Sequence, residues 1–284
     1  MMIHIAVVGG LREELLTLAQ VAHEQLGAQV HFSLYDYINE VKVPDVPYIT
    51  AVLAESEVKM VAQATEAMAS GQADILMKGI ISTRTVLKEV LKSDYELVTQ
   101  PLLSHVALAD IPSASRQLLI SDAAMNIEPD VDSLIHITNN AITVAHSRGI
   151  KQPKVALLSS AEQVNSKMPS SLLAHEVSVY FKERSDAVVS GPLSLDLATS
   201  EEAVAHKNFD GPVAGNADVL IVPTIDVGNV LYKSLTVFAG ATIGGMIVGT
   251  RMPIVLTSRS DSTESKLLAL TLALDHISNK KEQS

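Results

Sequence analysis

Short apolar runs alternate with longer amphipathic segments along the whole chain. Most of the apolar runs are continuous, which is typical of strands that are buried on both faces of a parallel sheet. We predict strands at residues 3–8, 28–34, 74–77, 104–109, 117–121, 154–159, 186–190, 217–222 and 253–257. We predict helices between them, at residues 11–26, 51–70, 83–92, 131–147, 170–184 and 229–238. This alternation of strands and helices indicates an α/β fold.

The number of predicted strands favours two sheets over one at this chain length. A weak boundary falls near Asp110-Ile111-Pro112-Ser113, after which the strand pattern restarts. We therefore expect two open, parallel-type α/β domains, with the last strand and helix returning to the first sheet. Residues 1–112 and 250–284 then form a discontinuous first domain, and residues 113–249 form an inserted second domain.

Charge and hydropathy exclude several classes of protein. The formal net charge of −11 disfavours nucleic-acid binding, which normally needs a basic face. No apolar run reaches the roughly 18 residues that span a bilayer, so we expect no membrane partner. The first residues, MMIHIAVVGGLREE, have no basic n-region and no cleavage site. They predict a first strand rather than a signal peptide, and hence a cytoplasmic protein.

Several familiar catalytic and cofactor signatures are missing from the sequence. The chain has no cysteine, which excludes disulfides and a cysteine-based acyl-enzyme, and its nine histidines show no metal-ligand spacing. No GxSxG and no P-loop motif is present. The run IAVVGG lacks the third glycine of a dinucleotide motif, and no acidic residue ends the predicted second strand. We therefore expect no metal and no tightly bound cofactor.

The segment IVLTSRSDSTESKLL, residues 254–268, is the strongest candidate for chemistry. An apolar strand leads through Ser258-Arg259 into a helix start, where Asp261 and Glu264 have the spacing of a capping box. Backbone N–H groups and the helix dipole favour an anion at such a turn, and an arginine adds a planar fork that suits phosphate. The alternative is an ordinary strand-to-helix turn with a polar cap.

A second candidate lies in residues 74–91, which begin with the third predicted strand. Lys78 ends the strand, Ser82 precedes a helix, and Arg84 and Lys88 are four residues apart, so they share one helix face. Cations in a first helical turn oppose the helix dipole, and a bound polyanion would explain them. A solvated basic face is the alternative.

Two further loops carry polar residues at predicted strand ends. A hydroxyl-rich loop with Ser160, Asn165 and Lys167 follows one strand, and it fits either a phosphate or cofactor site or a polar surface loop. The other loop contains Asp226 and precedes a helix that we expect to start at Asn229. Ligands of open α/β sheets bind beyond the carboxyl ends of the strands, where both loops are expected.

Four segments taken in order resemble one known family. They are ISDAAMNIEPD (120–130), GPLSLDLA (191–198), PVAGNADVLIVPTIDVGNVLYKSL (212–235) and TSRSDS (257–262), and the third is the most specific. The chain is similar to the phosphate acetyltransferase/phosphate butyryltransferase family over roughly residues 70–275. Its short length and the segment KGIISTRTVLKEVL resemble the butyryl branch more than the acetyl branch.

The resemblance implies a fold related to the isocitrate and isopropylmalate dehydrogenases, with the active site in the interdomain cleft. It also implies an acyltransferase that exchanges a butyryl group between coenzyme A and phosphate, so butyryl-CoA, CoA, phosphate and butyryl phosphate are the expected ligands. CoA is then a substrate or product rather than a resident cofactor. The metabolic partner implied is butyrate kinase, and we expect a homo-oligomer, at least a dimer.

The resemblance also assigns roles to residues. It places Ser258 and Arg259 at the reacting centre, and Lys88, with Arg84 beside it, in substrate binding. Acetyl-branch members carry an aspartate six residues beyond the arginine as a base for the CoA thiol, and this sequence has Ser265 there. Either Asp261 substitutes for that aspartate or no such base is needed.

Three other functions stay open on the sequence alone. Phosphate acetyltransferase activity is the alternative within the family. An NAD- and metal-dependent decarboxylating dehydrogenase on the same fold would need several carboxylates that converge on one metal, and this sequence has no matching motif. A non-catalytic CoA-binding protein would keep the basic site without turnover.

Overall fold

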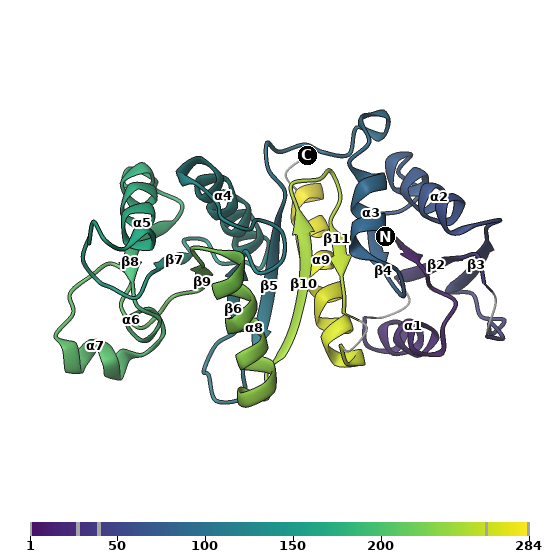
Figure 1. Ribbon diagram of the computed structural model, residues 1–284. Coiled ribbons are helices and arrows are strands. Elements are labelled where there is room, and N and C mark those ends of the chain that lie inside the picture. The colour runs from purple at the N-terminus through teal and green to yellow at the C-terminus, as the bar shows by residue number, and fades with distance from the viewer. Residues whose placement is uncertain (1, 27–28, 39–40, 259–260, 283–284) are drawn as a thin grey trace. The chain divides into compact units, whose positions relative to one another are not determined.

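A computed structural model describes residues 2–26, 29–38, 41–258 and 261–282 (Figure 1). The chain divides into two compact units. Unit 1 comprises residues 1–100 and 244–277, and unit 2 comprises residues 101–243 and 278–284. The domain boundaries that we expected from the sequence, after residues 112 and 249, remain predictions.

Unit 1 is built from a mainly parallel sheet with helices on both faces. Its elements are β1 (Ile3–Val8), α1 (Glu13–Leu26), β2 (Val30–Asp36), β3 (Ile49–Leu53), α2 (Glu57–Ala69), β4 (Ile75–Lys78), α3 (Thr83–Val90), the 3-10 turn η1 (Ser93–Tyr95), β10 (Thr242–Val248), β11 (Ile254–Leu256) and α9 (Thr263–Glu282). The strand order is β3-β2-β1-β4-β11-β10, and within this part β10 alone runs antiparallel to its neighbour β11.

The strand order of unit 1 reverses direction between β1 and β4. The chain moves from β1 outward to β2 and β3, and then returns across them to β4. Because parallel crossovers are right-handed, the outward helix α1 and the returning helix α2 must cover opposite faces. Figure 1 shows them on opposite sides of β1–β3. A ligand crevice is expected beyond the carboxyl ends of the strands at such a switch point.

The strands of unit 2 are also mainly parallel. Its elements are β5 (Ser104–Asp110), β6 (Leu118–Ser121), α4 (Val131–Ser147), β7 (Lys154–Leu158), α5 (Pro169–Tyr180), β8 (Val188–Leu193), α6 (Leu195–Thr199), α7 (Glu201–Lys207), β9 (Val219–Ile221) and α8 (Ile225–Ala239). The order is β5-β6-β9-β7-β8, with β5 antiparallel to β6. Helices α4 and α5 lie on one face and α6 to α8 on the other (Figure 1).

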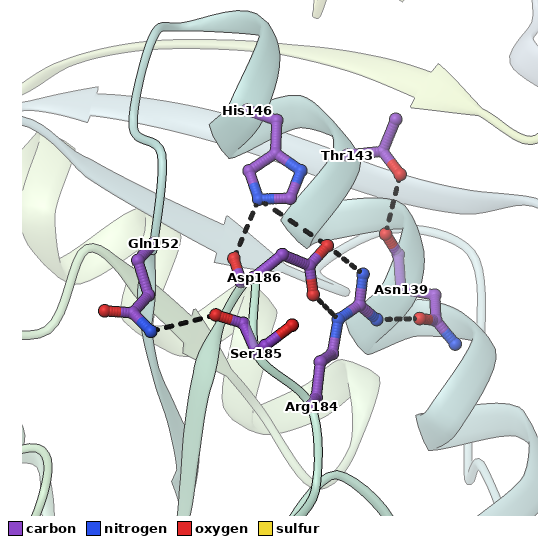
Figure 2. Close-up of polar contacts among 7 residues, drawn as sticks. All are labelled: Asn139, Thr143, His146, Gln152, Arg184, Ser185 and Asp186. Atoms are coloured by element: carbon purple, nitrogen blue, oxygen red, sulfur yellow. Dashed lines mark hydrogen bonds and ion pairs between the residues drawn. The ribbon is translucent and has the colours of Figure 1, made fainter.

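A polar clamp fixes the turn that leads into β8 (Figure 2). The guanidinium of Arg184 donates to both carboxylate oxygens of Asp186 and to the side chain of Asn139 on α4. Nε2 of His146, also on α4, lies 3.0 Å from the carbonyl oxygen of Asp186. The arginine hydrogen bonds hold the pKa of Asp186 below its usual value. The clamp lies at the amino end of β8, and it fastens this turn to α4.

Two strands and two short helices were not predicted. β3 precedes α2, and the sequence prediction of one helix over 51–70 is wrong for residues 51–53, which belong to β3. β10 contains Gly244 and Gly245, which look like breakers in the sequence. The structure explains the first of them, because a Cβ at Gly244 would lie 2.3 Å from the backbone nitrogen of Ala269 on α9. The short helices α6 and α7 were also missed.

None of the helices in the described part of the chain is both long enough and apolar enough to span a bilayer. Helix α8 is unusual for its exposure, since Gly228 is its only buried residue. Its Val230, Val237 and Phe238 are each more than 60% exposed.

Candidate active site

The loops after β1 and β4 touch through their backbones at the switch point of unit 1. Gly79 donates its N–H to the carbonyl of Val8 at 2.8 Å, and Ile80 donates to the carbonyl of Gly9 at 3.0 Å. A Cβ at Gly79 would lie 2.4 Å from the carbonyl oxygen of Gly9. Glycine is therefore required here, because any side chain would push the two loops apart.

Lys78 and Thr257 lock the carboxyl ends of β4 and β11 together. The hydroxyl of Thr257 donates to the carbonyl of Lys78 at 2.9 Å, and Nζ of Lys78 donates to the carbonyl of Thr257 at 2.7 Å. The same ammonium also donates to the carbonyl of Gly79 at 3.2 Å. Lys78 is only 5% exposed. The sequence singled out Lys78 as a substrate ligand, and the structure places its buried charge directly behind the Ser258 turn.

Ser258 and Asp261 close a tight turn by two reciprocal hydrogen bonds. The N–H of Asp261 donates to the carbonyl of Ser258 at 3.2 Å, and the N–H of Ser258 donates to Oδ2 of Asp261 at 2.6 Å. Ser258 itself is exposed. Its N–H is engaged by the carboxylate of Asp261. Arg259, the third predicted catalytic residue, lies outside the described residues.

The start of α9 differs from the expected capping box. The hydroxyl of Ser262 accepts the N–H of Ser265 at 3.2 Å, so Ser262 is the capping residue in place of Asp261. The prediction was wrong by one position because both residues have side chains that cap helices. Because Asp261 does not cap the helix, its carboxylate instead accepts the N–H of Ser258. Ser265, which stands at the position of the family's aspartate, is buried in the first helical turn.

Helix α3 ends at Val90, two residues earlier than predicted, and this changes how its two cations lie relative to the helix dipole. Arg84 lies in its first turn, but Lys88 lies in its last turn, where a cation is favourable to the helix dipole. The sequence argument from two opposed cations is therefore wrong for Lys88. Ser82 occupies the N-cap position and makes no capping bond with its side chain. All three side chains are exposed, so they remain accessible to an anion.

A separate pocket of about 850 Å³ lies at the carboxyl ends of β7, β8 and β9 in unit 2. Ser160 and Asp226, two of the predicted ligands, line it together. Its other walls include Val227, Val230 and Leu231 of α8. The pocket is thus mainly apolar, with a few hydroxyls and one carboxylate at its rim.

Asn165 and Lys167 are not among the described lining residues of this pocket. The side-chain oxygen of Asn165 accepts the N–H of Lys167 at 3.0 Å. The hydroxyl of the buried Ser171 accepts the N–H of Asn165 and lies 3.0 Å from the Asn165 carbonyl, to which it is placed to donate. Asn165 therefore shapes its own loop, whereas Lys167 is exposed.

Helix α8 begins earlier than predicted. It starts at Ile225, where the hydroxyl of Thr224 caps the N–H of Val227, and the expected start at Asn229 is wrong. Gly228 therefore lies inside the helix, where a Cβ would be 2.7 Å from the carbonyl oxygen of Asp122. This close approach lets α8 begin against the loop after β6 and places Asp226 in its first turn.

The sequence missed an acidic residue at the end of β2. Asp36 ends this strand, which was predicted to stop at residue 34. Its buried carboxylate accepts the N–H of Leu11 at 3.1 Å and a hydrogen bond from Arg12 at 3.0 Å. Asp36 therefore holds the loop after β1 in place.

Among the described residues, no group of three or more His, Asp or Glu side chains is placed to hold a metal ion.

Comparison with known proteins identifies a family for the chain. The family described as phosphate acetyl/butaryl transferase matches residues 36–274. A phosphate butyryltransferase of Clostridium acetobutylicum is 43% identical over 226 residues, which is 78% of this chain and 75% of the relative. The crystal structure of a branched-chain phosphotransacylase from Enterococcus faecalis V583 is 49% identical, with a TM-score of 0.93 over 97% of this chain and 99% of the other.

A wider group of enzymes shares only the fold. A 4-hydroxythreonine-4-phosphate dehydrogenase from Salmonella typhimurium superposes with a TM-score of 0.60 at 12% identity, over 97% of this chain and 100% of the other. The relation to dehydrogenase folds that the resemblance implied is therefore confirmed for the architecture. The extent of the family match and the identity to its members decide the assignment: the chain belongs to the phosphate acetyl/butaryl transferase family.

Proposed function

We propose that the chain is a phosphate butyryltransferase, which catalyses butanoyl-CoA + phosphate = butanoyl phosphate + CoA. The observation that carries the proposal is the exposed Ser258 beyond the carboxyl end of β11, next to the buried charge of Lys78 at the end of β4, in a member of this family. The butyryl and branched-chain activities named for the relatives support a short acyl chain longer than acetyl. Phosphate acetyltransferase remains the alternative within the family.

The reaction needs positioning and charge stabilisation more than it needs a base. A phosphate oxygen forms a bond to the thioester carbonyl carbon, and the carbonyl electrons move to its oxygen. When the tetrahedral intermediate collapses, the carbon–sulfur bond breaks and CoA leaves as a thiolate, which water then protonates. The thiol has a pKa of roughly 8.5, like that of cysteine, so it leaves with little help. No protein residue becomes acylated.

The turn supplies the groups for these steps. The hydroxyl of Ser258 donates to the developing oxyanion, and Arg259 orients the phosphate, as the family resemblance implies. The positive charge of Lys78 behind the turn favours a dianionic phosphate in front of it. Asp261 keeps the turn closed through its carboxylate on the N–H of Ser258. In this proposal Asp261 shapes the site, and the forward reaction uses no thiol base.

The remaining ligands hold coenzyme A. Arg84 in the first turn of α3 and Lys88 in its last turn present exposed charge to its phosphates, and Ser82 at the N-cap offers a hydroxyl. The pocket of unit 2 takes an uncharged part of CoA, because the carboxylate of Asp226 would repel a phosphate there. In the cell, an acyl kinase such as butyrate kinase would consume the acyl phosphate. A homo-oligomer and a cytoplasmic location also belong to this proposal.

Phosphate-dependent thiol release tests the function directly. The chain is incubated with butyryl-CoA with and without phosphate, and free thiol is followed over time. We expect release only when phosphate is present, with acyl phosphate formed in equal amount. CoA binding without phosphate-dependent release would show a binding protein instead of an enzyme.

The same assay with other acyl chains tests the acyl preference. Two further methylenes are worth about 0.8 kcal/mol each when buried, so butyryl-CoA should exceed acetyl-CoA by roughly fifteen-fold in kcat/KM. Propionyl-CoA and isobutyryl-CoA should fall between them or near butyryl-CoA. A kcat/KM for acetyl-CoA equal to that for butyryl-CoA would favour the acetyltransferase alternative.

A further inference from the structure

Lys266 is a buried cation at the start of α9, and nothing in the reaction described so far uses it. It lies in the first turn of the helix and is only 4% exposed. A positive charge at this end opposes the helix dipole, and burial removes the charge from water. Both effects disfavour a lysine here, so its presence needs a compensating contact.

The contacts of Lys266 point to the Ser258–Asp261 turn. Its Nζ donates to the carbonyl oxygen of Asp261 at 2.7 Å. The same Nζ lies 3.5 Å from Oε1 of Glu14, in the first turn of α1. That Glu14 oxygen is buried and accepts no hydrogen bond among the described residues, so the ammonium is its counter-charge.

Two buried lysines therefore hold the two ends of one short segment. Lys78, from the end of β4, binds the carbonyl of Thr257, and Lys266, from α9, binds the carbonyl of Asp261. Ser258 lies between these two carbonyls along the chain. A neutral donor would satisfy either carbonyl with a smaller desolvation cost. Two ammonium groups instead fix the turn and keep positive charge beside it.

We propose that Lys266 is a positioning residue for the acyl transfer, acting through the carbonyl of Asp261 to fix the Ser258–Asp261 turn in its reactive geometry. The inference rests on the proposed function, because it assigns the hydroxyl of Ser258 to the reacting atoms. Such a residue serves the transition state more than the binding of substrate. Its loss should therefore lower kcat and leave KM for butyryl-CoA nearly unchanged.

The test compares Lys266→Met with the double variant Glu14→Leu/Lys266→Met. The single variant removes the counter-charge from the buried Oε1 of Glu14, whose side chain is otherwise 41% exposed, so it should be somewhat less stable and should lose about 10²-fold in kcat. The double variant removes both charges of this half-buried pair and leaves no oxygen of Glu14 unpaired. We expect its thermal midpoint to recover while kcat stays low and KM for butyryl-CoA stays near the wild-type value.

The outcomes separate this inference from the proposed function. Lys59→Met, at an exposed lysine of α2, is the matched control and should behave as wild type. Recovery of kcat together with the thermal midpoint in the double variant would make Lys266 merely structural and overturn the inference. A wild-type enzyme without phosphate-dependent thiol release would instead overturn the proposed function. If Lys266→Met fails to fold, the double variant alone decides between these results.

Discussion

Two serine-bearing segments, residues 257–262 in unit 1 and 159–171 in unit 2, are held in place by different means. The first is held at its start by a residue far away in sequence, since Lys78 of β4 binds the carbonyl of Thr257, and at its end by Lys266 of the adjoining helix α9, which binds the carbonyl of Asp261. Both lysines are buried. The second is held mainly by its own members, such as Ser171, whose hydroxyl bonds the backbone of the same loop.

The ion pairs of the unit 2 loop also differ from those of unit 1. Glu162 in the loop pairs with Lys207 of α7 at 2.9 Å, and Lys207 pairs in turn with Asp196 of α6 at 3.0 Å. These side chains are exposed, whereas the lysines behind Ser258 are buried. Exposed pairs contribute little to stability, while buried groups are costly to leave unpaired. The comparison indicates a fixed reacting turn in unit 1 and a binding loop in unit 2 that tolerates change.

The largest effect should follow from removing the hydroxyl of the fixed turn. Ser258→Ala should lower kcat by about 10²–10³, the usual loss for one donor to an oxyanion. The thermal midpoint should stay near wild type, because Ser258 is exposed. Steady-state kinetics with butyryl-CoA and phosphate measure the first effect and calorimetry the second.

Ser185→Ala is the control for that variant. Ser185 is exposed at the amino end of β8, away from the pocket at the carboxyl ends of the unit 2 strands, so its kinetics should be unchanged. A Ser258→Ala enzyme with wild-type kcat would remove the reacting turn from the mechanism. The comparison between the two segments would then lose its functional meaning.

A smaller effect of another kind should follow from changes in the unit 2 pocket. Ser160→Ala or Asp226→Asn removes one polar contact with bound CoA, which is worth about 0.5–1.5 kcal/mol, or roughly two- to ten-fold in KM. Since such a contact binds substrate and transition state alike, kcat should change little. A fall in kcat without a rise in KM would place these residues at the chemistry and contradict the contrast between the two segments.

The sequence predicted the strand and the helix that flank Ser258 because their signals are local. An apolar strand, then Ser258, then a helix start with a polar cap can be recognised from neighbouring residues alone. Likewise, continuous apolar runs located most strands, and the helix at 131–147 was predicted to the residue. The fold class followed from this alternation, and the family resemblance was confirmed by comparison.

The parts that the sequence missed depend on contacts between distant residues. Lys266 meets Glu14, and Lys78 meets Thr257, although in each pair the whole of residues 101–243 separates the two partners along the chain. No periodicity or spacing reports such pairs. No strand was predicted around Gly244, although this glycine is the place where α9 packs closely on β10. At each of these positions tertiary packing determines the structure, and the pattern of neighbouring residues does not report it.

The smallest effect should come from the exposed ion pairs of the unit 2 loop, and its pH dependence has a definite sign. A hydrogen bond from Ser194, followed by one from Lys207, lowers the pKa of Asp196 from 3.8 to about 2. Because the folded-state pKa is below the ordinary value, this carboxylate stabilises the fold above about pH 4. The contribution is lost as the pH falls towards 2.

Lys207→Met tests whether these pairs matter beyond the loop itself. At pH 7 we expect faster hydrogen–deuterium exchange in residues 161–167, with a thermal midpoint close to wild type because exposed ion pairs are screened by water. Lowering the pH from 4 to 2 should reduce the protection factors of the same amides in the wild type, relative to their intrinsic exchange rates at each pH, since Asp196 then loses its charge. A fall in thermal midpoint as large as that of Lys266→Met would show that exposure does not distinguish the two segments. If instead only the loop responds, the contrast between the exposed ion pairs of unit 2 and the buried lysines of unit 1 holds.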